Sequence, residues 1–227
     1  MIDNINPADI EKRSFEIISE LLGAKELDPQ NAPVVKRVIH TTADFDYADN
    51  LVFSEDAVAK GLAALRAGCD IVTDTQMAKA GINKTILARL GGTVHCFMSD
   101  PDVAAEAKKR GITRAFVSME KAAAIGKPCI FAIGNAPTAL IALYDLIKSG
   151  KTAPALVIGV PVGFVNVIES KELILNMNSH AGDQTDDSVN ERSGAKTDIP
   201  YIVAKGRKGG SNVAAAICNA LLYQITR

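Results

Sequence analysis

Residues 129–148 read CIFAIGNAPTALIALYDLIK, and this stretch decides the fold class. Residues 129–133 are continuously apolar, which is typical of a strand buried on both faces. The turn GNAP follows, and Pro137 occupies a position that the first turn of a helix tolerates, so a helix is predicted over 138–148. A buried strand that turns directly into a helix is the repeating unit of a parallel α/β sheet.

The same alternation extends on both sides of this stretch. Further strands are predicted at 71–73, 93–98, 155–160 and 201–204. Further helices are predicted at 54–67 with Ser54 as N-cap, from 74 onward, at 101–110 and at 211–223. Two more helices, at 7–22 and 32–40, precede them. We therefore expect one domain over 1–227, α/β in class, with three α/β/α layers, a mostly parallel central sheet and a helical N-terminal segment.

Composition limits the partners and the location. The 227 residues carry 25 basic and 26 acidic side chains, a formal net charge of -1, which removes the long-range attraction of nucleic-acid and membrane binders. No apolar run reaches the roughly 20 residues of a membrane helix and no signal pattern opens the chain, so we expect a cytoplasmic protein. The four cysteines are scattered and without metal-ligand spacing, so they are interpreted as reduced core residues: Cys69, Cys96, Cys129 and Cys218.

Residues 176–198, NMNSHAGDQTDDSVNERSGAKTD, break the pattern. They are almost free of large apolar side chains and are too long for an ordinary connection between elements. We expect a mobile polar insertion here, either passive or acting as a lid over a ligand.

Three glycine-rich turns follow predicted strands: GNAPT at 134–138, GVPVG at 159–163 and GRKGGS at 206–211. Ligands of parallel sheets collect beyond the carboxyl ends of the strands, where backbone N–H groups can hold an anion. GRKGGS adds Arg207 and Lys208, but it matches neither the dinucleotide nor the P-loop pattern. The turns predict a broad, anion-binding cleft, although each of them could also simply end a strand.

His40 is the histidine that stands out. It ends a predicted helix and precedes TTADFDYAD, whose hydroxyls and carboxylates could orient an imidazole for acid or base chemistry. A helix-capping role explains the same position equally well. His95 lies within a predicted strand, where a hydrogen-bonded core or edge histidine is the simpler interpretation. No pattern for an activated nucleophile is present.

Several blocks of the sequence, taken together, resemble one family. They are RSF at 13–15, VIHTTADFDYA at 38–48, TDTQMAKAGI at 73–82, TRA at 113–115, AIGNAPTAL at 132–140, PALVIGVPVGFV at 154–165, ESKE at 169–172 and GRKGGSN at 206–212. These blocks are similar to the precorrin-8X methylmutases, also called cobalt-precorrin-8 methylmutases, of corrin synthesis. The resemblance covers nearly the whole chain apart from residues 176–198.

The resemblance implies a flavodoxin-like fold, a homodimer and an isomerase that moves a methyl group between adjacent ring carbons of precorrin-8 or its cobalt form, giving a cobyrinate. No cofactor is implied, because any cobalt belongs to the tetrapyrrole substrate. The family's active-site histidine falls on His40, as a general acid toward a ring nitrogen. Residues that the resemblance places near the substrate are Arg13, Ser14, Thr41, Thr42, Asp44, Asn83, Arg114, Asn135, Gly209, Gly210 and Ser211.

Within that set, Thr41, Thr42 and Asp44 are expected to orient His40. Asn83, Asn135 and the three residues of the GGS segment are expected to bind carboxylate arms of the ring. Two alternatives remain open from the sequence: a non-catalytic corrinoid carrier on the same fold, and a nucleotide-binding α/β enzyme that uses GRKGGS.

Overall fold

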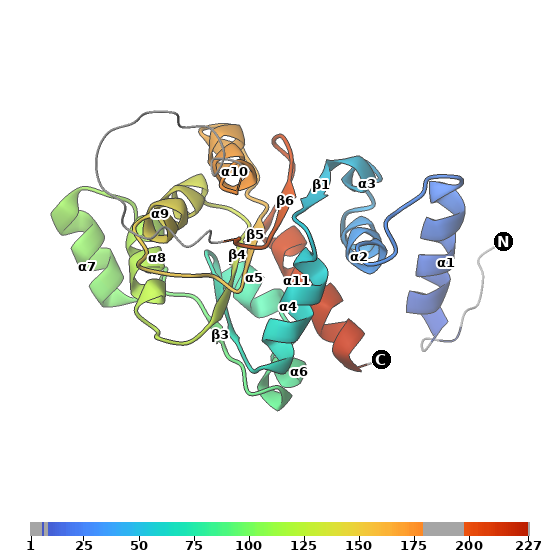
Figure 1. Cartoon of the computed structure of the whole chain (residues 1–227), viewed down its shortest axis with the longest axis horizontal. Coiled ribbons are helices and arrows are strands. Elements are labelled where there is room, and N and C mark those ends of the chain that lie inside the picture. Colours follow the sequence, from blue (N-terminus) through green and yellow to red (C-terminus); the bar gives the residue numbers. More distant parts are fainter. Residues whose placement is uncertain (1–5, 7–8, 179–197, 227) are drawn as a thin grey trace, which may run out of the picture.

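A computed structural model describes residues 6, 9–178 and 198–226, and its centre is a six-stranded sheet of order β1-β6-β5-β4-β2-β3 (Figure 1). The strands are β1 Leu51–Phe53, β2 Asp70–Thr73, β3 Val94–His95, β4 Cys129–Ile133, β5 Leu156–Gly159 and β6 Tyr201–Ala204. β1 is antiparallel to β6, and every other neighbouring pair is parallel. The predicted α/β class with a mostly parallel sheet is confirmed.

Helices cover both faces of the sheet, because alternate strand residues point to opposite sides. Ile130 and its neighbours face one core, with α2 Ala32–Thr42, α4 Ala57–Arg66, α6 Lys84–Arg89 and α11 Ser211–Thr226. Phe131 faces the other core, with α8 Arg114–Ala123, α9 Pro137–Lys148 and α10 Val167–Leu175. The remaining helices pack outside these layers or at their ends: α1 Ile10–Leu22, α3 Tyr47–Asn50, α5 Gln76–Gly81 and α7 Pro101–Arg110.

The strand β1 was not predicted, and it changes the role expected of Ser54. α4 begins only at Ala57, after Asp56 in the left-handed region, so Ser54 is not its N-cap. Instead the Ser54 hydroxyl accepts the N–H of Tyr201 at 2.9 Å, and the Ser54 N–H donates to the Tyr201 carbonyl at 3.0 Å. These two bonds prolong the antiparallel pairing of β1 with β6 by one residue.

Several other boundaries differ from prediction. α2 continues two residues past His40, and the hydroxyls of Thr41 and Thr42 donate to carbonyls four residues back at 3.0 and 2.8 Å. The helices α8 and α10 were missed, and β3 covers only two residues of the predicted run 93–98. Of the predicted insertion at 176–198, residues 179–197 lie outside the described part of the chain.

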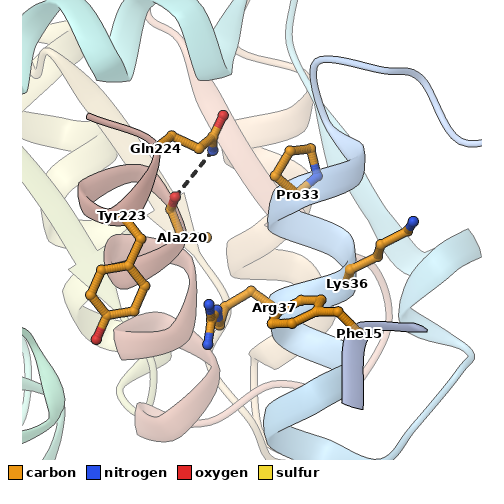
Figure 2. A pocket seen from close by; sticks show the side chains of 7 residues that line it. All are labelled: Phe15, Pro33, Lys36, Arg37, Ala220, Tyr223 and Gln224. Atoms are coloured by element: carbon orange, nitrogen blue, oxygen red, sulfur yellow. Dashed lines mark hydrogen bonds between the residues drawn. The ribbon is translucent and has the colours of Figure 1, made fainter. Parts of the chain in front are cut away.

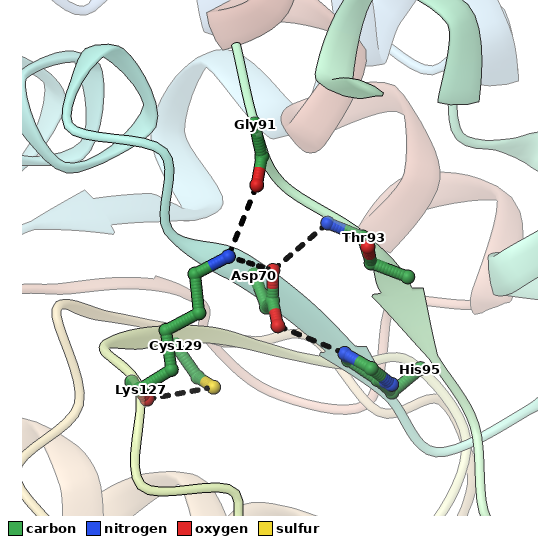
Figure 3. A network of polar contacts seen from close by, with 6 residues as sticks. All are labelled: Asp70, Gly91, Thr93, His95, Lys127 and Cys129. Atoms are coloured by element: carbon green, nitrogen blue, oxygen red, sulfur yellow. Dashed lines mark hydrogen bonds and ion pairs between the residues drawn. The ribbon is translucent and has the colours of Figure 1, made fainter. Parts of the chain in front are cut away.

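A network of polar contacts surrounds Asp70, at the amino end of β2 (Figure 3). The Asp70 carboxylate accepts Lys127 Nζ at 2.8 Å and the Thr93 N–H at 2.9 Å, and it lies 2.9 Å from His95 Nε2. Burial raises the pKa of Asp70, but these three partners outweigh burial and hold the pKa below its ordinary value. His95 is thus an edge histidine with a carboxylate partner, as the sequence suggested.

The four cysteines are buried and unpaired, which agrees with their interpretation as reduced core residues. Burial raises the pKa of Cys69 to about 12 and that of Cys129 to about 11, so both thiols are neutral at physiological pH. Among the described residues, no helix combines the length and the apolar character needed to cross a membrane.

Candidate active site at the carboxyl edge of the sheet

The three glycine-rich turns meet at the carboxyl edge of the sheet and pack directly on one another. A Cβ atom on Gly209 would lie 2.1 Å from the carbonyl oxygen of Val160, and one on Gly134 would lie 2.7 Å from that of Gly210. The Gly210 N–H donates to the Val160 carbonyl at 2.9 Å. These glycines are therefore required because backbone approaches backbone, which only a residue without a side chain allows.

The GNAPT turn does not offer its amides to a ligand. Its N–H groups at Gly134, Asn135 and Ala136 donate to the fully buried carboxylate of Asp74 at 2.9, 2.8 and 2.6 Å. Burial raises the pKa of Asp74, and the three donors oppose that rise. These three backbone N–H groups are therefore not available to an external anion, because an internal carboxylate already accepts them.

The GVPVG turn is also satisfied internally. The N–H groups of Val160, Val162 and Gly163 donate to the carbonyls of Ile133, Gly134 and Arg207, at 2.9, 3.4 and 3.3 Å. Its backbone joins the other two turns and leaves those donors unavailable to a ligand. These backbone N–H groups of the two turns are thus used to hold the edge together and are not available to a ligand.

GRKGGS is the turn that keeps donors available. Within the described residues, the N–H groups of Arg207, Lys208, Gly209 and Ser211 have no hydrogen-bond partner. Ser211 is also the first residue of α11, whose free N–H groups carry a partial positive charge. We define residues 206–211 as the anion loop, the part of the edge that can bind carboxylates through its backbone.

Lys208 ties the anion loop to the segment that follows α2. Its Nζ atom lies 2.7 Å from Asp44 Oδ2 and 2.5 Å from Asp46 Oδ2. Hydrogen bonding to these carboxylates raises the pKa of Lys208, and the Lys208 ammonium lowers the pKa of Asp44. Asp44 is four residues from His40, so this ion pair brings the end of α2 to the anion loop.

His40 lies in the last turn of α2 with an exposed side chain. Its ring stacks on Phe15 of α1 with centroids 5.3 Å apart and planes at 10°. The groups expected to orient it have other partners: Thr41 and Thr42 bond back to their own helix, and Asp44 binds Lys208. The ring contact that the structure gives the imidazole is the one with Phe15, and the orienting role of Thr41, Thr42 and Asp44 stays a prediction.

Arg13 and Ser14 lie on α1 beside Phe15, but they have contacts within their own helix. Arg13 pairs with Glu16 and Glu20, both at 3.3 Å, and Ser14 donates to the Ile10 carbonyl at 2.9 Å. All of these side chains are exposed or half-buried. The structure thus brings the RSF block to His40 through Phe15.

Arg114 and Asn135 both present exposed side chains near helix starts. Arg114 is the first residue of α8, and its N-cap Thr113 donates to Thr138 of α9 at 3.2 Å, so these two helices begin side by side. No ion pair among the described residues uses Arg114, which leaves its charge for a ligand. Asn135 stands on the GNAPT turn next to the same helix starts.

Asn83 is the candidate that the structure separates from the others. Its side chain caps α6 by accepting the Ile86 N–H at 3.1 Å, and its backbone N–H donates to Asn219 Oδ1 at 2.8 Å. Asn219 lies eight residues beyond Ser211 on α11, about 12 Å along the helix axis. Asn83 therefore belongs to the packing of α5 and α6 on α11.

Exposed apolar side chains adjoin the anion loop. Val162, Phe164 and Val165 follow β5 and are 45%, 80% and 78% exposed, and Met77 at the start of α5 is 70% exposed. The Arg207 guanidinium lies 5.4 Å from the centre of the Phe164 ring and donates to the Phe164 carbonyl. An apolar surface beside cations and free N–H groups suits a ligand with a flat apolar body and anionic arms.

A cavity of about 130 Å³ lies between α1, α2 and α11, away from the anion loop (Figure 2). Figure 2 shows the Arg37 guanidinium between two rings, 4.7 Å from the centre of Phe15 and 5.0 Å from that of Tyr223. Pockets that bury a drug-sized ligand measure roughly 300 to 1,000 Å³, so this cavity is too small for a macrocycle. The Arg37 guanidinium that lines it packs on the ring of Phe15, which in turn stacks on His40.

Sequence reasoning missed Asp74, Lys171 and the pairing of Lys208. Asp74 could have been found as an acidic residue directly after a buried strand, in a position to cap the turn that follows the neighbouring strand of the sheet, β4. Lys171 lies in α10, which was not predicted, and its burial could not be read from the charged block ESKE. The partners of Lys208 are more than 160 residues away, and no local signal identifies them.

Comparison with known proteins gives the site its context. The profile of the family described as Precorrin-8X methylmutase matches residues 9–224. A cobalt-precorrin-8 methylmutase of Salmonella typhimurium is 45% identical over 96% of this chain and 96% of its own, and one of Priestia megaterium is 43% identical over 96% and 88%. A Precorrin-8X methylmutase of Pseudomonas aeruginosa is 35% identical over 97% and 98%.

A solved structure agrees with these sequence matches. The crystal structure of a precorrin-8x methyl mutase from Thermus thermophilus superposes with a TM-score of 0.80, at 38% identity and with 95% of each chain covered. The fold, the family profile and the relatives that match nearly the full chain all indicate the same family. The chain therefore belongs to the precorrin-8X methylmutase family, the intramolecular methyl-moving isomerases of cobalamin synthesis.

Proposed function

We propose that this chain converts precorrin-8 or its cobalt complex to the corresponding cobyrinate, with His40 as the general acid. The observation that carries the proposal is the arrangement of the carboxyl edge, where free N–H groups, unpaired cations and exposed apolar side chains lie together and the Lys208 ion pair links them to the end of α2. This combination matches a flat ring with several carboxylate arms.

In this proposal the ring lies against the apolar side chains of Val162, Phe164 and Val165. Its carboxylate arms accept hydrogen bonds from the anion loop and from the guanidinium of Arg114, and these contacts fix the ring relative to His40. Binding that excludes water and distorts the ring supplies much of the rate.

The reaction itself moves one methyl group from a ring carbon to its neighbour while the double bonds shift. Substrate and product are isomers, so the reaction needs no oxidant or reductant. His40 donates a proton or a hydrogen bond to a ring nitrogen, which favours the rearranged conjugated system, and it recovers the proton afterwards. A well-placed general acid typically contributes roughly 10²-fold to 10⁴-fold in rate.

The test incubates the purified chain with precorrin-8 and, separately, with its cobalt complex, and follows the visible spectrum. We expect turnover by the wild type and, with metal-free precorrin-8, a loss of at least about 100-fold in kcat for His40→Ala, with product affinity within a few-fold. Lys36→Ala, one turn earlier on α2, is the matched control and should turn over normally. Binding of the coloured product without any turnover by the wild type would identify a carrier instead and reject the proposal.

The two substrates also test where the proton goes. In the cobalt complex the lone pairs of the ring nitrogens are on the metal, so donation to nitrogen can assist only the metal-free ring. We expect His40→Ala to be more damaging with metal-free precorrin-8. An equal loss of kcat with both substrates would indicate that His40 donates its proton at the ring periphery and not at a nitrogen.

We also propose that the active form is a homodimer. The outer face of α1 supports this, because Ile10, Ile17 and Leu21 are 52%, 40% and 66% exposed and share one side of the helix. Light scattering coupled to gel filtration should give about twice the 24.0 kDa of the chain. A monomer mass at micromolar concentration would reject this part.

A further inference from the structure

Lys171 is a fully buried lysine directly beneath the anion loop. It is 1% exposed, and its Nζ atom donates to the carbonyl oxygens of Gly206 and Lys208, both at 2.8 Å. Burial is the sole cause that lowers its pKa, to about 8, so no carboxylate of the described residues compensates the charge. An ammonium group buried without a counter-anion is costly, and most buried lysines are paired with one.

The two carbonyl contacts determine which way the anion loop presents its donors. A trans peptide places its C=O and N–H groups on opposite sides of the same plane. Because the Gly206 and Lys208 carbonyls point inward to Lys171, the N–H groups of Arg207 and Gly209 point away from it. Those N–H groups are among the donors that have no partner in the described part of the chain.

We propose that Lys171 is a positioning residue that turns the N–H groups of Arg207 and Gly209 toward the substrate and places a positive charge behind them, so that the anion loop binds a carboxylate arm of the ring. The inference rests on the proposed substrate, since it assigns the missing counter-anion of Lys171 to that ligand. Lys171 does not touch the ligand. It acts through two peptide groups, as a fixed charge within one hydrogen bond of each.

A purely structural lysine would explain the observations less well. The loop is already anchored by the Gly210 N–H on Val160 and by the hydroxyl of Ser211, 2.8 Å from that of Thr75. A long apolar side chain could fill the same space under the loop without burying a charge, and such replacements of buried charges are often neutral for stability. What an apolar residue cannot supply is a positive potential at the N–H groups.

The test compares Lys171→Met with wild type for affinity toward two forms of the coloured product, one with free carboxylates and one with every carboxylate methylated. Lys171→Met should weaken binding of the free acid by about 10-fold to 100-fold, the effect of one charge-assisted contact, and change binding of the methyl ester less than about 3-fold. KM for precorrin-8 should rise more than kcat falls. Lys205→Met, an exposed lysine just before the loop, is the matched control and should bind both forms as wild type does.

Two outcomes would overturn the inference: unchanged affinity for the free acid, or an equal loss for both forms, which indicates a structural role alone. If Lys171→Met does not fold, Lys171→Gln and Lys171→Arg decide. Gln keeps one donor without charge and should lose affinity for the acid, whereas Arg keeps the charge and should retain most of it. A wild type that binds neither product form rejects the proposed function and this inference with it, whereas normal wild-type binding with an unaffected Lys171→Met rejects the inference alone.

Discussion

Replacing Asp74 by Asn should destabilise the carboxyl edge without changing its shape or volume much. The Asp74 carboxylate is fully buried and accepts three backbone N–H groups, from Gly134, Asn135 and Ala136, at 2.9, 2.8 and 2.6 Å. An Asn side chain offers one acceptor oxygen, and its NH₂ group must face at least one of these N–H donors. In the better orientation the Gly134 N–H loses its partner and the other two bonds lose their ionic component.

The magnitude follows from those contacts. A buried N–H left without a partner costs about 1 to 3 kcal/mol, and loss of the charge from each remaining bond costs up to about 1 kcal/mol more. Relief of the buried charge offsets part of this sum. We expect Asp74→Asn to lower the free energy of unfolding by about 2 to 4 kcal/mol. We also expect a lower kcat/KM, because the GNAPT turn packs on the anion loop through Gly134.

Urea denaturation followed by circular dichroism measures the change, since the chain has no tryptophan for fluorescence. Asp145→Asn is the matched control: it makes the same substitution at an exposed position on α9, and the midpoint should stay at the wild-type value. An unfolding midpoint for Asp74→Asn equal to wild type would refute the reasoning that the carboxylate holds the turn.

Three further predictions concern other parts of the fold. Asp70→Asn should lower the free energy of unfolding by about 2 kcal/mol above pH 5. Because the pKa of Asp70 is lowered in the folded state, the difference from wild type should shrink as the pH falls below about 4. Urea midpoints from pH 7 to pH 3 test this, and a difference that stays constant over that range would argue against the network. Gly209→Ala should lower the free energy of unfolding by about 2 kcal/mol or more, because the new Cβ would meet the Val160 carbonyl. Gly206→Ala has open space around it and should lower this free energy by only about 1 kcal/mol, through backbone strain. Equal melting temperatures of the two variants would contradict this prediction. Arg114→Ala should raise KM for precorrin-8 about 10-fold with a smaller change in kcat, and an unchanged KM would remove Arg114 from the site.

Much of the fold was predictable because the signals are local. β4 with its run of apolar residues, and α7 with Pro101 at its start and Gly111 after its end, agree with the predicted bounds. The antiparallel β1 was missed, because LVF is too short to show a period and its pairing partner lies 150 residues away. The start of α4 was misplaced for a related reason, since Ser54 has its hydrogen-bond partner on β6 and not in its own helix.

The candidate site divides in the same way. The sequence by itself determined the strand–turn–helix units, the positions of the glycine-rich turns, the position of His40 at a helix end and the family resemblance. Each of these depends on short segments of residues that are contiguous in the chain. Only the tertiary structure decided which turn keeps free N–H groups, because that depends on the partners of each amide: Asp74 occupies the amides of GNAPT, and neighbouring carbonyls occupy those of GVPVG. The burial of Lys171 and the ion pair of Lys208 were likewise decided by segments far apart in the chain, since solvation and charge depend on which atoms surround a group in space.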